Sequence, residues 1–157
     1  LAHYLAGDFE AAAEAYARCA DVSVHPDSKV ATAYWRTLTL LRLGRDAEAE
    51  AVMAAITPDM EVIESGGYLD LVLLFKGERT PDDILGAFAE DVTLAGTTAT
   101  YGVGMWHKLR GDPQQAEELF RVNLSGDSQW AAFGYIASEA ELAGAAKVEQ
   151  EVLALIR

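Results

Sequence analysis

The sequence predicts an all-α protein made of about five helical hairpins stacked on one another, and two observations predict it. The first is composition: hydrophobic residues make up 51% of the 157-residue chain, alanine is abundant, and there are only four prolines. This balance favours helices over strands. The second is a glycine that ends an apolar run five times. These glycines are Gly7, Gly44, Gly77, Gly111 and Gly144.

The glycines recur at spacings of 37, 33, 34 and 33 residues. A period near 34 is the length of two helices of about a dozen residues joined by two tight turns. Glycine adopts the left-handed backbone conformation that ends many helices, without steric cost. Each glycine is therefore expected to end the first helix of a hairpin and to begin the turn into the second.

The residues that follow each glycine also recur. Five positions on, three units have alanine: Ala12, Ala49 and Ala116. Nine positions on, four units have a large apolar residue: Tyr16, Met53, Phe120 and Leu153. A four-residue step places the small and the large residue on one face of the second helix. That helix can then cross close to its partner and fill the gap beside it.

Capping residues mark where the second helices begin. Asp8, Thr80 and Asp112 precede them, and Pro81 and Pro113 suit a first helical turn. Turn-rich segments at 25–27, 57–59 and 125–127 separate the hairpins. The expected helices are 9–20, 29–43, 46–56, 61–76, 81–91, 98–110, 113–124, 128–143 and 146–156. They form one domain with units at about 1–24, 25–59, 60–94, 95–126 and 127–157.

Two stretches, YLAGDFEAA at 4–12 and RGDPQQAEELF at 110–120, resemble the tetratricopeptide repeat family. They are similar to its signature of turn glycine, alanine and aromatic residue. Gly104 matches the family's other glycine, where the two helices cross most closely. The resemblance implies a right-handed superhelix of helical hairpins. The segment 129–142 is similar to the C-terminal end of uncharacterised bacterial members, which implies a bacterial origin and no activity.

Some units depart from the family pattern. The third needs two extra residues, such as Arg79 and Thr80, before Ile84 and Phe88 take the alanine and aromatic places. The fifth has Glu149 where alanine is expected. Residues 1–6 are the stump of a first helix, so we expect the first hairpin to be truncated and the array to extend upstream.

The resemblance also implies a concave groove, lined by the first helices of successive hairpins, where a partner protein or peptide lies. The lining would include Tyr4, Tyr34, Leu38, Leu41, Arg42, Leu71, Leu74, Tyr101, Met105, Lys108 and Glu141. The same positions also feed a helical core, so the alternative is that a tight superhelix covers them internally. Chaperone-binding members grip a terminal carboxylate with lysine and asparagine. Tyr34, Leu38, Tyr101 and Met105 occupy those places here, which argues against that role.

Charge and hydropathy exclude several partners. Acidic residues outnumber basic ones 25 to 12, a net charge of −13, which would repel the phosphate backbone of nucleic acids. No apolar run reaches the roughly 20 residues of a membrane span. The truncated first hairpin leaves apolar residues without their usual cover, so homo-oligomerisation through that end is a further expectation. These residues are Leu1, Tyr4, Leu5 and Phe9.

The sequence contains no recognisable catalytic constellation. Paired acids at 82–83 and 117–118 suit first turns or solvent faces, where they offset the helix dipole. The three histidines are widely separated, and no Gly-x-Ser-x-Gly segment or phosphate-binding glycine loop is present. We therefore predict no enzyme, no catalytic residue, no metal and no cofactor. Trp35, Trp106 and Trp130 are expected to pack in the core, and so is Cys19.

These patterns predict a non-catalytic scaffold for protein–protein interaction, acting through the groove or through the ends of the solenoid. The alternative is a regulatory or docking module of a larger enzyme or of an envelope-assembly lipoprotein. Localisation stays open: the cytoplasm is favoured, with a periplasmic or lipid-anchored location if an upstream signal has been removed.

Overall fold

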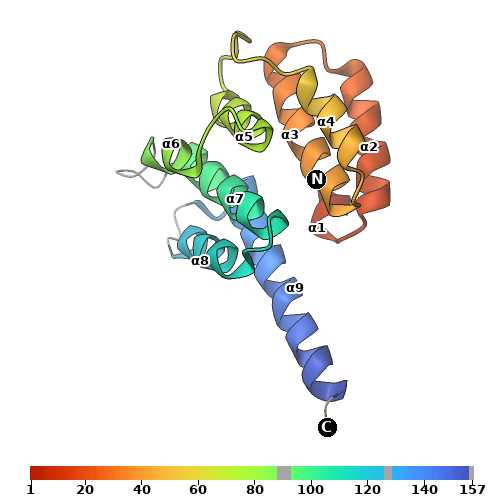
Figure 1. Cartoon of the computed structure of the whole chain (residues 1–157), viewed down its shortest axis with the longest axis vertical. Coiled ribbons are helices and arrows are strands. Elements are labelled where there is room, and N and C mark those ends of the chain that lie inside the picture. The colour runs from red at the N-terminus through yellow and green to blue at the C-terminus, as the bar shows by residue number, and fades with distance from the viewer. Residues whose placement is uncertain (88–92, 126–128, 156–157) are drawn as a thin grey trace.

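The computed structural model describes residues 1–87, 93–125 and 129–155 (Figure 1). Within these ranges the chain forms helices and no strand, which confirms the all-α prediction. The helices are α1 (Ala2–Leu5), α2 (Phe9–Val22), α3 (Pro26–Arg42), α4 (Asp46–Ala54), α5 (Gly66–Lys76), α6 (Pro81–Gly86), α7 (Leu94–Leu109), α8 (Pro113–Leu124) and α9 (Phe133–Leu155).

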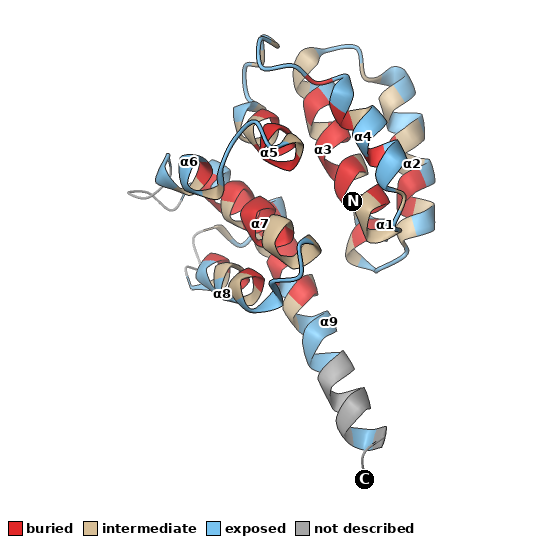
Figure 2. Ribbon diagram, in the orientation of Figure 1, coloured by how far each residue is buried: buried red, intermediate tan, exposed pale blue. Residues whose placement is uncertain are grey.

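The helices alternate between two roles. The first helices of the hairpins lie side by side, with α3 against α5, α5 against α7 and α7 against α9. The second helices pack between them: α2 and α4 both contact α3, and α8 contacts both α7 and α9. Buried residues concentrate on α3, α5, α7 and the N-terminal half of α9 (Figure 2). The core is therefore made mainly by the first helices.

Four of the five predicted glycine turns are present. Gly7, Gly44, Gly77 and Gly111 have φ of +78°, +68°, +82° and +86°, the left-handed region that glycine adopts most readily. The predicted caps are also present. The carboxylates of Asp8 and Asp112 accept hydrogen bonds from backbone N–H groups of α2 and α8, and Thr80 forms a reciprocal capping box with Asp83.

The predicted packing positions are buried wherever the structure describes them. Ala12, Ala49 and Ala116 are at most 1% exposed, and the large residues four positions on, Tyr16, Met53 and Phe120, are buried. Ile84 is also buried, whereas Phe88 and the side chain of Leu153 lie outside the described part.

The close helix crossing expected at Gly104 is confirmed. A Cβ atom there would lie 2.6 Å from the ring of Phe120. A side chain at position 104 would therefore force the Phe120 ring to shift, so the glycine lets this residue of α8 pack directly on α7.

The fifth hairpin does not form, so the helix break predicted at Gly144 is wrong. One continuous helix, α9, runs from Phe133 to Leu155 through Gly144, and its C-terminal part extends beyond the other helices (Figure 1). The sequence after Gly144 explains this. Ala145 and Ala146 stand where the other turns have a capping or turn residue, and alanine is the strongest helix former.

Other helix ends shift by a few residues. The helix predicted at 29–43 begins at Pro26 behind the His25 cap, and the one predicted at 98–110 begins at Leu94 behind the Thr93 cap. The last helix begins at Phe133 and not at 128, which leaves Trp130 outside it and 70% exposed. The predicted burial of Trp130 is therefore wrong. Cys19 is also exposed, although its Sγ lies 3.4 Å from the Thr32 hydroxyl of α3, so its predicted burial is wrong too.

The helix predicted from residue 61 begins only at Gly66, because Asp27 captures the preceding backbone. The Asp27 carboxylate accepts hydrogen bonds from the N–H groups of Ile63 (3.1 Å), Glu64 (2.7 Å) and Ser65 (2.7 Å). These bonds, above all the one from Glu64, lower the pKa of Asp27 from 3.8 to about 2. One side chain at the start of α3 thus holds the segment that leads into α5.

We expect the substitution Asp27→Asn to destabilise the protein in a pH-dependent way. The pKa of Asp27 is lower in the folded protein than the 3.8 of the unfolded chain, so the ionised carboxylate stabilises the fold fully above pH 3.8. This stabilisation is lost as the pH falls towards about 2, where the carboxylate becomes protonated in the folded protein. Urea unfolding of both proteins from pH 7 downwards measures it. The wild type should be the more stable at pH 7, and the difference should shrink below pH 4. A difference that is constant with pH would contradict the role given to the Asp27 carboxylate.

No helix in the described ranges is both long enough and apolar enough to cross a membrane.

Candidate functional site

A cleft with a volume of about 600 Å³ opens where α1 meets α3, α7 and α9. It is lined by Tyr4, Leu5, Ala6, Gly7, Phe9, Arg42, Lys108, Ala137, Ala140, Glu141, Gly144 and Ala145. We call it the charged cleft, because Arg42, Lys108 and Glu141 meet in it. Positions 137, 140, 141, 144 and 145 share one face of α9 and form one wall of the cleft. Besides Glu141, these positions carry only alanine or glycine.

Glu141 holds the two cations of the cleft together. One carboxylate oxygen accepts a hydrogen bond from Nη1 of Arg42, and the other accepts from Nζ of Lys108 at 2.5 Å. The Glu141 side chain is 7% exposed, whereas those of Arg42 and Lys108 are 19% and 34% exposed. A single buried carboxylate on α9 therefore ties α3 to α7, and the cluster keeps one excess positive charge.

The guanidinium of Arg42 is also held by aromatic rings. It lies 4.5 Å from the centre of the Phe9 ring and 5.7 Å from that of Tyr4, both within the range of cation–π attraction. Burial acts to lower the pKa of Arg42, but the interactions with Tyr4 and Glu141 outweigh it, and the pKa is raised above its usual value. Arg42 thus stays charged, with its position set by α1, α2 and α9.

Beside the charge cluster, α1 contacts α7 directly. The hydroxyl groups of Tyr4, on α1, and Tyr101, on α7, form a buried hydrogen bond of 2.9 Å. The Trp35 ring stacks on Tyr101 at 5.8 Å and makes an edge contact with Tyr4 at 5.3 Å. Burial raises the pKa of both tyrosines, so these hydroxyls stay protonated at neutral pH.

Burial separates the predicted groove residues into two sets. The first set is fully buried, at 0–1% exposure, so its side chains have no surface for a partner: Tyr34, Leu38, Leu71, Leu74, Tyr101 and Met105. The second set lines the charged cleft: Tyr4, Arg42, Lys108 and Glu141. Leu41 is half-buried and faces a different hollow, beside Met53 and Phe75. The six residues of the first set are therefore covered internally, which is the alternative that the sequence left open.

The N-terminal end, where homo-oligomerisation was predicted, is largely covered. Tyr4 is 3% exposed, while Leu1, Leu5 and Phe9 are partly buried against the core. The cover of Tyr4 comes from Phe9 of α2, Trp35 and Arg42 of α3 and Tyr101 of α7.

Sequence reasoning did not assign the small-residue wall on α9 to a site. Its signal was present in the spacing of Ala137, Ala140, Glu141 and Gly144, which is the spacing of one helical face. The predicted helix break at Gly144 hid it.

Within the part of the chain that the structure describes, no group of three His, Cys, Asp or Glu side chains could hold a metal ion.

Comparison of the chain with models of known protein families, with curated proteins and with solved structures finds no match.

Proposed function

We propose that this protein is a non-catalytic scaffold of the tetratricopeptide type, and that the charged cleft binds an acidic segment of a partner protein. The observation that carries the proposal is the net positive charge of this cleft in a chain of net charge −13. The recurring glycine turns and the alanine contacts support a superhelix of the tetratricopeptide kind. The hydrogen bond between Tyr4 of α1 and Tyr101 of α7 is compatible with such a superhelix of tight curvature.

The charge balance selects an acidic ligand. The charged lining residues of the cleft are Arg42, Lys108 and Glu141. Glu141 accepts only one of the three N–H donors of the Lys108 ammonium, so donors remain for a second carboxylate. With a third of its side chain exposed, Lys108 is the cation that a ligand can reach. A basic segment would instead meet two like charges.

The walls of the cleft suit a peptide. Small residues on α9 and at the turn after α1, such as Ala140, Gly144 and Gly7, let a peptide backbone approach closely. Leu5 and Phe9 supply apolar surface for one or two ligand side chains. Apolar anchors beside a charged contact are typical of peptide recognition.

Calorimetric titration with two blocked peptides tests this. One peptide alternates leucine with glutamate, and the other replaces each glutamate with glutamine. We expect only the acidic peptide to bind, and its affinity to fall as salt is added. The variant Lys108→Gln should weaken it about tenfold, the size of one charge-assisted hydrogen bond.

Lys29→Gln is the matched control, because Lys29 is exposed on α3 away from the charged cleft. It removes the same charge and should leave the affinity unchanged. Equal affinities of the two variants, or equal binding of the acidic and neutral peptides, would refute the proposed site.

A further inference from the structure

A second hollow, of about 290 Å³, lies at the N-terminal ends of α5, α7 and α9, whereas the charged cleft involves the C-terminal end of α7 and the middle of α9. It is lined by Glu64, Gly67, Tyr68, Leu94, Ala95, Thr98, Ala131 and Phe133, and we call it the apolar notch. Along α7, Leu94 is about 20 Å from Lys108 at 1.5 Å per residue. The notch is thus separate from the charged cleft, and a ligand bound in the notch would not depend on the proposed function of the cleft.

Two exposed apolar side chains line this notch, and two more come directly before lining residues in the sequence. Seven large hydrophobic residues in the described ranges are exposed, and three of them, all valines, lie elsewhere. Of the other four, Leu94 (62% exposed) and Phe133 (53%) line the notch, and Ile63 (83%) and Trp130 (70%) immediately precede the lining residues Glu64 and Ala131 in the sequence. Single exposed apolar residues are ordinary, but a cluster around a hollow marks an interaction site.

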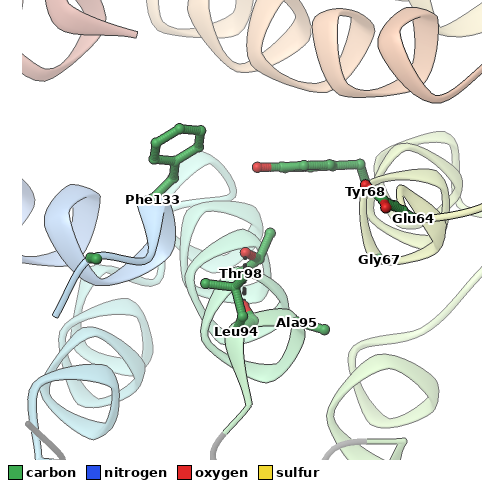
Figure 3. A pocket seen from close by; sticks show the side chains of 8 residues that line it. Glu64, Gly67, Tyr68, Leu94, Ala95, Thr98 and Phe133 are labelled. Carbon is green, nitrogen blue, oxygen red and sulfur yellow. Dashed lines mark hydrogen bonds between the residues drawn. The ribbon is translucent and has the colours of Figure 1, made fainter. Parts of the chain in front are cut away.

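The notch has the shape of a socket for an apolar side chain. Phe133, at the start of α9, and Tyr68, on α5, approach it from opposite sides, with Leu94 and Thr98 of α7 between them (Figure 3). The Thr98 hydroxyl donates to the carbonyl of Leu94 at 3.1 Å, so it is already engaged. A volume near 290 Å³ is at the low end of the about 300–1,000 Å³ of small-molecule pockets, which suits anchor side chains of a docked segment.

The walls of the notch are held in place before any partner arrives. On one side, a Cβ at Gly134 would lie 2.4 Å from the Thr97 carbonyl oxygen, so α9 begins directly against α7. Asn123 joins these helices by donating to Thr97 O and to Ser138 Oγ, both at 3.0 Å. On the other side, Asp27 holds residues 63–65. A preformed site loses little conformational entropy on binding.

Charge decides what the notch accepts. Glu64 is the one charged residue in its lining, and its carboxylate forms no ion pair within the described residues. A second copy of this chain would add another charge of −13 and would be repelled. We propose that the apolar notch docks a basic amphipathic segment of a partner protein, with an apolar anchor in the socket and a lysine or arginine beside Glu64.

The probe is a labelled amphipathic helical peptide of leucine and lysine, and fluorescence anisotropy at physiological salt measures its affinity for the full chain. We expect Phe133→Ser and Leu94→Ser each to weaken binding about tenfold, the effect of losing most of one apolar contact. Val122→Ser is the matched control, because Val122 is 60% exposed on α8. All three side chains are more than half exposed, so circular dichroism and the unfolding midpoint should stay unchanged.

A second pair of variants tests the charge. Glu64→Gln should weaken binding of the lysine peptide more than Glu118→Gln, which removes the same charge from an exposed position on α8. Equal effects of the notch and control variants would overturn the proposal, and so would equal affinity for a peptide with glutamate in place of lysine. Sedimentation that shows a wild-type dimer and a Leu94→Ser monomer would also overturn it, because a second copy would then fill the notch.

Discussion

Replacing Glu141 with glutamine is expected to lower the free energy of unfolding by about 3 kcal/mol. The substitution keeps the shape of the side chain but removes the charge that two cations share. Lys108 can turn towards solvent, since a third of its side chain is exposed. Arg42 lies against Phe9 and Tyr4 and would be left as a partly buried cation without its carboxylate.

Urea unfolding followed by circular dichroism measures this loss. The control is Glu118→Gln, which removes an exposed acid from α8 and should change stability by less than about 0.5 kcal/mol. The double variant Lys108→Gln/Glu141→Gln should recover little, because Arg42 remains unpaired. A loss no larger than that of the control would show that Glu141 does not hold α3, α7 and α9 together.

Gly134→Ala is expected to destabilise the protein by about 3 kcal/mol, at the upper end of what overpacking costs. The added methyl would lie 2.4 Å from the carbonyl oxygen of Thr97 and 2.9 Å from the Cα of Thr98. These are backbone atoms of α7, so no side chain can turn aside to relieve the clash. The start of α9 would have to move away from α7.

Gly144→Ala makes the same chemical change in the same helix, but we expect it to raise the free energy of unfolding. A Cβ there meets nothing within 4 Å, and Gly144 has an ordinary helical backbone in α9. Alanine should stabilise the helix by about 0.5–1 kcal/mol. Thermal unfolding of the two variants in parallel separates the predictions. Similar losses for both would mean that α9 tolerates no alanine at either glycine, and the close contact at Gly134 would not be the cause.

Local sequence signals predicted most of the fold, because each acts within one helical turn of the chain. The turn glycines at 7, 44, 77 and 111, the Asp and Thr caps and the alanine positions depend on neighbours a few residues away. The helix boundaries that were predicted wrongly depend on contacts between distant residues or lack a local sequence signal. Helix α5 starts late because Asp27, some 36 residues earlier, takes the backbone N–H groups before it.

The site was harder to predict than the fold. The family resemblance placed Arg42, Lys108 and Glu141 among the groove residues, but it gave no reason to expect them to contact one another. Their contacts join residues 99 and 33 positions apart. Trp130 was expected in the core because the helix was extended too far towards it. Because of that error, the exposed Trp130 beside Ala131, a lining residue of the apolar notch, was not expected at the surface.

By itself, the sequence determined the all-α class, the hairpin turns and the residues that pack each hairpin, because backbone preference and helical periodicity are local. Only the tertiary structure decided which predicted groove residues stay accessible. The hydrogen bond between Tyr4 and Tyr101 joins α1 to α7, and Glu141 joins α9 to Arg42 of α3 and Lys108 of α7. The packing of α3, α5 and α7 buries the apolar groove residues, and the contacts of Glu141 leave a cleft with excess positive charge, because the stacking of distant helices sets the distances between side chains.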